Sequence, residues 1–133
     1  MTAGAPLFLT LAEVVELHRK GVERFGGSAE MRDLGLLQSA LAMPQAGFGG
    51  EFLHPDLAAM AAAYLFHLVS NHPFVDGNKR IGAVAARVFL LMNDAQFDPS
   101  ETEYGDLVLG VARGEVSKDE VIAFFRKFVR PQQ

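Results

Sequence analysis

Cysteine is absent from the 133 residues of this sequence. A disulfide framework, a thiolate nucleophile and a cysteine-based zinc site are therefore excluded. A chain without disulfides fits a cytoplasmic location best. Residues 1–8 lack the basic start, apolar run and small-residue cleavage site of a secretory signal, so we expect no such signal there.

Long hydrophobic runs are also lacking. The longest strongly apolar stretch, residues 57–69, contains His67 and is shorter than the roughly 20 residues that span a bilayer. We therefore expect a buried helix there and no membrane partner. Positive charge is scarce as well, because 12 basic residues face 16 acidic ones and the formal net charge is −4. This balance argues against direct nucleic-acid binding.

Hydrophobic residues make up half of the sequence, which is enough for one compact core. At this length we expect a single domain over residues 1–133. No internal repeat, linker or useful alternating strand pattern is present, and apolar residues recur at helical spacing. The sequence thus predicts an all-α bundle of about six helices. The expected helices cover residues 10–24, 35–43, 55–70, 78–93, 100–112 and 117–131.

Local signals mark the ends of several of these helices. Capping-box spacing is present at Thr10 and at Ser117, each followed three residues later by a glutamate. Pro55 is expected in the first turn of the third helix. Residues 45–53 contain three glycines and two phenylalanines without helical period. They predict a loop or a short extended flap ahead of the third and fourth expected helices.

The most informative stretch is residues 72–80, HPFVDGNKR, between the third and fourth expected helices. Pro73 cannot continue the preceding helix, and Gly77 allows a sharp turn into the next one. The first amides of a helix have no intrahelical partner and carry the positive end of its dipole. The backbone around Gly77, Asn78 and Lys79 should therefore form an anion site, with phosphate as the expected ligand.

The side chains of this stretch add the chemistry of phosphate transfer. Arg80 offers a planar fork for two phosphate oxygens, and Lys79 adds a point charge. Asp76 is a hard oxygen ligand suited to Mg²⁺ shared with the phosphates of a nucleotide. His72 is a residue type that titrates near neutral pH and can take a proton from an attacking hydroxyl. We interpret as catalytic His72, Asp76 and Arg80, and as phosphate-binding Gly77, Asn78, Lys79 and Arg80.

A plain helix start is the alternative interpretation, with Asp76 as the N-cap, Gly77 as the turn and Arg80 in solvent. It explains each residue alone but not their combination. Lys79 and Arg80 in the first turn oppose the helix dipole by about a few tenths of a kcal/mol each, which a bound polyanion would reverse. We therefore favour a binding site.

HPFVDGNKR resembles the signature of the Fic/Doc superfamily, H-P-F-x-D/E-G-N-G-R. Lys79 stands where the AMP-transferring Fic enzymes have their second glycine, and H-x-F-x-D-G/A-N-K-R is the variant of the Doc, or death on curing, branch. A second stretch, RDLGLLQSALAMPQ at residues 32–45, is similar to the Doc-type R-D-x-G-L-L-x-S-A-L-x-x-P-Q. With two motifs and a Doc-like length, the resemblance covers nearly the whole chain and implies the fold of that superfamily.

The resemblance also implies an activity. Doc-type proteins bind ATP with Mg²⁺ so that the γ-phosphoryl group is presented, and they pass it to a threonine of elongation factor Tu, which arrests translation. The resemblance therefore implies a toxin with protein kinase activity. A Fic-type protein adenylyltransferase, which transfers AMP, remains an alternative. A non-catalytic module that binds a nucleotide or a partner is another.

The same resemblance implies a partner and a groove. Doc-type toxins are held inactive by a Phd-type antitoxin, whose disordered tail folds into a groove near the active site. In the superfamily the segment ahead of the motif helices can pair with the backbone of the target, so Phe48 and Phe52 are candidates for lining that groove. Closing the edge of the core is an equally good interpretation of both. Arg32 is a further candidate, although we favour a structural ion pair with Asp33.

Three other residues receive structural interpretations. His18 lies in the apolar stripe of the first expected helix, where a hydrogen-bonded, partly buried side chain is favoured over a catalytic one. Phe74 should anchor the loop in the core rather than touch a substrate. Gly82 indicates a close approach of either a packed helix or a bound nucleotide.

Overall fold

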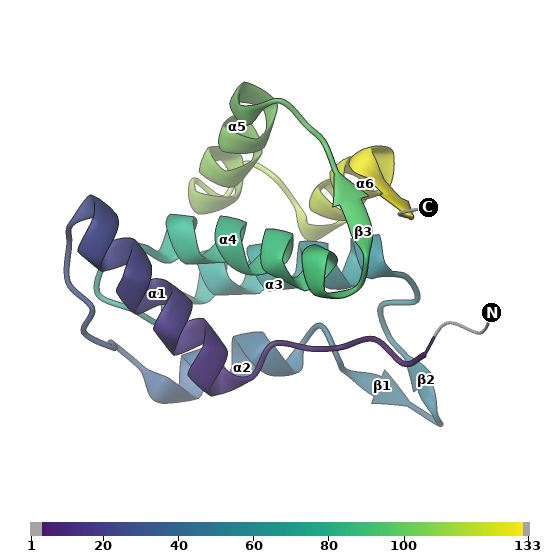
Figure 1. Cartoon of the computed structure of the whole chain (residues 1–133), viewed down its shortest axis with the longest axis horizontal. Helices are drawn as coiled ribbons and strands as arrows, with labels where there is room; N and C mark the ends of the chain where they lie inside the picture. Colours follow the sequence, from purple (N-terminus) through teal and green to yellow (C-terminus); the bar gives the residue numbers. More distant parts are fainter. Residues whose placement is uncertain (1–3, 132–133) are drawn as a thin grey trace.

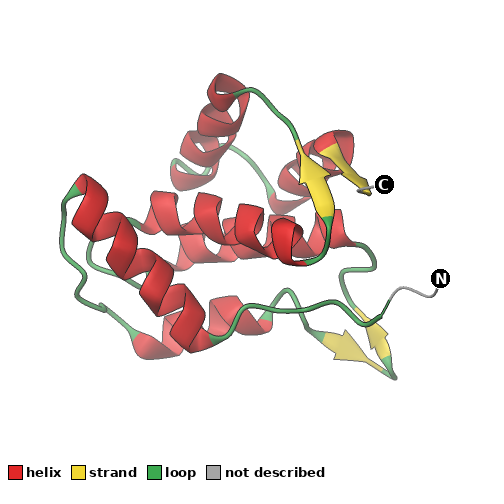
Figure 2. Cartoon of the chain, in the orientation of Figure 1, coloured by secondary structure: helices red, strands yellow, loops and turns green. Residues whose placement is uncertain are grey.

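The structure is a computed structural model, and it describes residues 4–131 (Figure 1). Six helices carry most of the chain and the strands form two short antiparallel pairs, which confirms the all-α prediction (Figure 2). Over the described residues, none of these helices is long and apolar enough to cross a membrane. The elements are α1 (Leu11–Phe25), α2 (Leu34–Ala42), β1 (Gly47–Phe48), β2 (Glu51–Phe52), α3 (Leu57–Asn71), α4 (Asn78–Met92), β3 (Ala95–Phe97), α5 (Glu101–Ala112), α6 (Lys118–Phe128) and β4 (Val129–Pro131).

Helix α3 forms the centre of the fold. Its residues 58–65 are all buried and mostly alanine, which lets neighbouring helices approach closely. Helix α4 packs along α3 over the most extensive contact in the described chain. A Cβ atom at Gly82 would lie 2.6 Å from Cγ2 of Val69, so the close approach predicted at Gly82 is to a packed helix. Helices α1 and α2 cover one side of this pair, and α5 and α6 cover the other (Figure 1).

The helix starts follow the local signals with one exception. The predicted capping boxes are present at Thr10 and Ser117, and Ser100 forms a third one at the start of α5. The prediction that places Pro55 in the first turn of the third helix is wrong. Asp56 caps that helix instead, because its carboxylate accepts a hydrogen bond of 2.8 Å from the amide of Ala59.

Strands β3 and β4 lie where the sequence predicts a loop and the end of the last helix. They pair antiparallel, and both expectations are wrong at these positions. Helix α6 ends at Phe128 because Val129 adopts an extended backbone, with φ −88° and ψ 130°. The ring of Phe97 in β3 stacks on Phe125 of α6, with centroids 4.6 Å apart. Contacts between distant segments, which local periodicity does not record, therefore decide this region.

The predicted flap is a hairpin of β1 and β2. Gly49 and Gly50 form its tip with φ of 62° and 84°, the left-handed conformation that glycine adopts without strain. The hairpin lies at the N-terminal end of α3, whereas residues 72–80 follow the C-terminal end of that helix (Figure 1). A helix of 15 residues, about 22 Å long at 1.5 Å per residue, separates the two along the chain.

Candidate active site

The motif loop, defined here as residues 72–77, connects α3 to α4 and lies against the segment that precedes α2. Residues 30–33 pair with residues 73–75 through three main-chain hydrogen bonds of 2.8 to 3.0 Å. Met31 and Phe74 form an isolated antiparallel bridge between these two segments. The motif loop is therefore fixed by a segment from much earlier in the sequence.

His72 begins the motif loop with its side chain exposed to solvent. Its φ of 48° is unusual for a residue other than glycine and marks a conformation that the surroundings impose. Arg32 imposes it: Nε donates to the carbonyl of His72 at 2.6 Å, and Nη2 donates to the carbonyl of Asn71 at 3.0 Å. The last carbonyls of a helix lack intrahelical donors. Arg32 supplies those donors and fixes the backbone that carries His72.

The ion pair predicted between Arg32 and Asp33 is not formed. Arg32 binds the end of α3, and Asp33 caps α2 by accepting a hydrogen bond of 2.9 Å from the amide of Leu36. The ion-pair interpretation is therefore wrong, although both residues do fix the connection between α1 and α2. Each binds a main-chain group: the guanidinium of Arg32 donates to carbonyls, and the carboxylate of Asp33 accepts from an amide.

The three groove candidates are not brought together. Phe48 and Phe52 belong to the hairpin, whereas Arg32 lies beside the other end of α3. Phe48 is 94% exposed, so it does not close the edge of the core. Phe52 is partly covered by Phe8, with ring centroids 5.7 Å apart. The hairpin therefore presents one almost fully exposed aromatic side chain to solvent.

Asp76 is bonded through both its side chain and its main chain. Its Oδ2 accepts from the amide of Ser28 at 2.9 Å, and its carbonyl accepts from Nε2 of His18 at 2.7 Å. A side chain at Gly27 would crowd this contact, because a Cβ atom there would lie 3.3 Å from that of Asp76. Helix α4 has Gly77 as its N-cap and no side-chain cap hydrogen bond. The interpretation of Asp76 as the N-cap is therefore wrong.

Phe74 anchors the motif loop in the core, as predicted. It is 1% exposed and stacks on the ring of His18, with centroids 3.6 Å apart and planes at 8°. The side chain of Asn78 closes the loop, since Oδ1 accepts from the amide of Phe74 at 3.0 Å and Nδ2 donates to its carbonyl at 2.9 Å. The amide side chain of Asn78 is thereby occupied. Its backbone N–H is the group that remains for a phosphate.

The start of α4 presents donors without acceptors. The backbone amides of Gly77, Asn78 and Lys79 have no hydrogen-bond partner within residues 4–131. Nη1 of Arg80 is buried and also lacks a partner in this part of the chain. A Cβ atom at Gly77 would lie 3.3 Å from Nη1, which places the guanidinium beside the helix start. A buried N–H group without an acceptor is costly, and a bound anion would satisfy this guanidinium nitrogen together with the amides.

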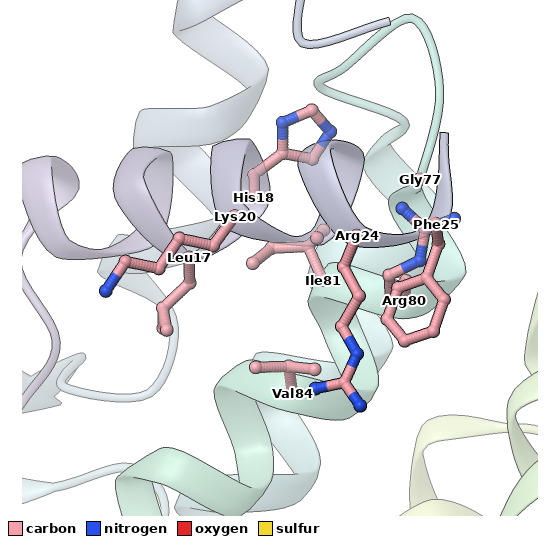
Figure 3. A pocket seen from close by; sticks show the side chains of 10 residues that line it. Leu17, His18, Lys20, Arg24, Phe25, Gly77, Arg80, Ile81 and Val84 are labelled. Atoms are coloured by element: carbon pink, nitrogen blue, oxygen red, sulfur yellow. The ribbon is translucent and has the colours of Figure 1, made fainter. Parts of the chain in front are cut away.

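A pocket of about 200 Å³ opens between α1 and the first turns of α4 (Figure 3). Its lining in the described chain includes three cations, Lys20, Arg24 and Arg80, and no carboxylate. The guanidinium carbons of Arg24 and Arg80 lie 5.4 Å and 5.1 Å from the ring centroid of Phe25. Pockets that enclose a drug-sized ligand have about 300–1,000 Å³. A nucleotide with its phosphates here would therefore be only partly enclosed.

A divalent cation fits this site as one shared with bound phosphates. Among the described residues, no group of three histidine, aspartate or glutamate side chains could hold a metal ion. Asp76 is exposed, and its Oδ1 lies outside the hydrogen bond to Ser28. Mg²⁺ is commonly bound by one or two carboxylates together with substrate phosphates and water. Asp76 beside the free amides matches that pattern.

Sequence reasoning missed several residues that shape the site. The prediction that His18 is hydrogen-bonded is confirmed, but its partner in the motif loop is visible only in the fold. Lys20 and Arg24 are four residues apart on α1 and so share a face, and Gly21 beside them is a poor helix former. Two cations on one helix face beside a glycine were the sequence signal that could have indicated this side of the site. A Cβ atom at Gly21 would lie 3.1 Å from Cδ of Arg80, so the glycine makes room for the motif arginine.

Comparison with known proteins places the site in a family. The sequence matches the Fic/DOC family over residues 8–90. The chain belongs to the Fic/DOC family. The matched residues run from the start of α1 through most of α4, and they include the motif loop and every side chain described above that binds it. The resemblance noted in the motif is thereby confirmed.

Two relatives within the Fic/DOC family are Doc proteins. The chain is 41% identical over 113 residues to Toxin Doc of Mycolicibacterium smegmatis, which covers 82% of this chain and 85% of the relative. It is 34% identical over 115 residues to Protein kinase doc of Escherichia phage P1, which covers 86% and 90%. These identities confirm the Doc branch that Lys79 indicates.

Proposed function

We propose that this Fic/DOC protein is a Doc-type toxin that transfers the γ-phosphoryl group of ATP to a hydroxyl group of a protein. The observation that carries the proposal is the buried Nη1 of Arg80, which has no partner within residues 4–131 and lies beside amides that are also free. A polyphosphate supplies the acceptors that these groups lack. The relatives named as a toxin and as a protein kinase support the same activity.

In the proposed reaction His72 is the general base. Its exposed side chain is accessible to a hydroxyl group carried by a second protein. The hydroxyl oxygen bonds to the γ-phosphorus as the bond to the β–γ bridging oxygen breaks, His72 takes the hydroxyl proton, and ADP leaves. Lys79 and Arg80 neutralise the charge on the transferred group. Asp76 would hold Mg²⁺, whose charge when bound neutralises the phosphates.

Lys79 supports phosphoryl transfer over AMP transfer. It lies in the first turn of α4 with its side chain exposed, at the position where the Fic motif has a glycine. A long cationic side chain there occupies space that a glycine leaves open to phosphates. The Doc variant of the motif has this lysine, and in that branch the γ-phosphoryl group is the one presented. We therefore propose a protein serine/threonine kinase activity.

The proposed target is a threonine of elongation factor Tu, with translation arrest as the result, and the proposed regulator is a Phd-like antitoxin. Both proposals follow from the Doc branch, and both place the protein in the cytoplasm. The open site agrees with a protein substrate, because His72 and Lys79 are exposed where a second macromolecule can cover them. The exposed Phe48 of the hairpin is proposed as a contact for such a partner, as are Phe52 and Arg32.

A labelling experiment with the purified chain tests the proposal. ATP labelled at the α- or the γ-phosphorus is incubated with the chain, Mg²⁺ and elongation factor Tu. We expect γ-label and one added phosphate on the target, located at a threonine by mass spectrometry. Retained α-label with the mass of AMP would identify an adenylyltransferase instead. Nucleotide binding without any transfer would identify a non-catalytic module, and His72→Ala is the negative control.

A further inference from the structure

Two contacts join His18 of α1 to the motif loop. Nε2 donates to the carbonyl of Asp76 at 2.7 Å, and the ring stacks on Phe74 with centroids 3.6 Å apart. The side chain is only 3% exposed, so it does not meet a hydroxyl group of a target. We propose that His18 is a positioning residue for the phosphate site, which sets the orientation of the peptide group that starts α4. This inference deepens the proposed function and rests on it.

The geometry of one peptide group gives the reason. The peptide between Asp76 and Gly77 is planar and trans, so its C=O and N–H point to opposite sides. The hydrogen bond from His18 directs the carbonyl toward α1, and the Gly77 amide therefore points away from His18. Gly77 has φ of 79°, and glycine tolerates both hands of backbone conformation. Without the donor, little in the local chain prevents this peptide from reorienting.

The same contact bears on both charged groups of the site. The carboxylate of Asp76 also accepts a hydrogen bond from the amide of Ser28. Asp76 is therefore bound at its carbonyl by α1 and at its side chain by the turn after α1. A Cβ atom at Gly77 would lie 3.2 Å from Nε2 of His18 and 3.3 Å from Nη1 of Arg80. The imidazole thus occupies space beside the guanidinium. Its loss would release the peptide and open room into which Arg80 can move.

Two substitutions separate the donor from the ring. His18→Phe keeps an aromatic ring for Phe74 and removes the N–H group, whereas His18→Gln keeps an N–H donor and removes the ring. Val14→Ala is the control, because Val14 is fully buried one turn earlier on α1 and lies outside the site. The affinity of each full-length variant for Mg²⁺ with an ATP analogue whose β–γ bridge is an imide is measured by calorimetry, together with its thermal midpoint.

We expect His18→Phe to weaken binding of the analogue about tenfold, which corresponds to one hydrogen bond of about 1.4 kcal/mol. His18→Gln should bind within about threefold of the wild type, because it restores the donor. Val14→Ala should lower the midpoint and leave the affinity unchanged. Equal losses in both His18 variants would overturn the proposal. A loss in Val14→Ala as large as that in His18→Phe would overturn it as well.

Failure of the proposed function gives a different result, because the wild-type chain itself would then not bind the analogue or not transfer phosphate. The positioning role is in that case measured without ligand, from the amide resonance of Gly77 in nuclear magnetic resonance spectra. The resonance should shift in His18→Phe and return toward its wild-type position in His18→Gln. An unchanged resonance in His18→Phe would overturn the proposal whatever the protein binds.

Discussion

Buried side-chain nitrogens without partners occur in two regions of the described chain, and the regions differ in chemistry. Nη1 of Arg80 lies beside the motif loop, whereas Nδ1 of His54 and Nε2 of His67 lie where α3 and the segment before it approach α6. Arginine keeps its charge in proteins, but histidine can release its proton. The unpartnered nitrogen of Arg80 therefore supports the proposed anion site, whereas the histidine region needs only to stay neutral.

The histidine region does stay neutral. Burial is the main cause that lowers the pKa of His67 to about 4, and the nearby positive charge of Lys118 contributes to the same shift. The same two causes lower the pKa of His54, which is 4% exposed. Burial lowers the pKa of Lys118 as well. An unpartnered buried nitrogen thus supports the proposed binding site at Arg80, where the charge is permanent, and indicates an acid-sensitive part of the core at the two histidines, where it is not.

The largest effect on activity is expected from His72→Ala. Loss of a general base lowers a transfer rate by about 10²- to 10⁴-fold. The side chain of His72 is exposed, so the thermal midpoint should not change. Transfer of the γ-phosphoryl group to elongation factor Tu and thermal unfolding are measured on the same preparation. A transfer rate within tenfold of the wild type would show that another group accepts the proton.

Arg80→Met should weaken the binding of inorganic triphosphate by about 10- to 100-fold, because a charge-assisted hydrogen bond contributes about 1.5–3 kcal/mol. Its free energy of unfolding should stay the same or rise, since the substitution removes a buried guanidinium nitrogen that has no partner among the described residues and keeps a side chain of similar length. Titration calorimetry and urea unfolding measure the two effects.

Arg87→Met is the control for this prediction. Arg87 pairs with Glu101 at 3.0 Å and lies over the ring of Tyr104, outside the lining of the pocket beside Arg80. Its loss should not change triphosphate binding. If Arg80→Met unfolded more easily than the wild type by about 1 kcal/mol or more, Arg80 would be a packing residue. The contrast between the two regions would then disappear.

Acid should destabilise the protein through the histidine region. Unfolded His67 has a pKa near 6.5 and folded His67 one of about 4, so between these values the unfolded chain binds more protons. The contribution to stability is therefore complete above pH 6.5 and is lost as the pH falls toward 4. At pH 5 we expect a loss of about 1–2 kcal/mol in the free energy of unfolding, measured in urea against pH 7.

His67→Leu should remove most of this pH dependence, because leucine has no proton to bind. His72→Ala is the comparison, since that histidine is exposed and its loss should leave the acid sensitivity in place. An equal fall in stability of His67→Leu and the wild type between pH 7 and pH 5 would assign the effect to other groups.

The smallest effect is expected from Gly21→Ala, and it should move stability and binding in opposite directions. Alanine favours the helix by about 0.5–1 kcal/mol over glycine. The new Cβ atom would lie 3.1 Å from Cδ of Arg80, so we expect triphosphate binding to weaken a few-fold. Gly105→Ala in α5 is the control, because a Cβ atom there meets nothing within 4 Å. It should raise the free energy of unfolding and leave triphosphate binding unchanged. Equal triphosphate affinity in Gly21→Ala and the wild type would contradict the role of the glycine.

Local signals carried much of the fold and part of the site. Capping spacing at Thr10 and Ser117 and the glycines of the hairpin are effects within a few residues, and the structure confirms them. The phosphate-binding interpretation of residues 76–80 likewise rests on neighbours in the chain, and it remains a proposal. It depends on residue types at a helix start, which a sequence displays directly.

The rest depends on contacts that a sequence does not display. Asp76 is a plausible N-cap by its position, but the amide of Ser28 takes its carboxylate. Arg32 is adjacent to Asp33, yet it binds the carbonyl of His72 across the fold. His18 gives no sign of its partner, because a histidine in an apolar stripe has the same pattern whether it binds the motif loop or another buried group. In each case the competing partner lies about 40 or more residues away along the chain.

All the hydrogen bonds described above for the motif loop are made by residues 18–78, and the family match ends at residue 90. Helices α5 and α6 contact α3 on the side away from these residues. We therefore expect inherited substitutions in the last third of the chain to change the stability of the folded protein, and with it its lifetime in a cell. They should leave the rate of the proposed reaction unchanged. Natural variants that differ only in that third should therefore differ in cellular abundance and have the same rate of the proposed reaction.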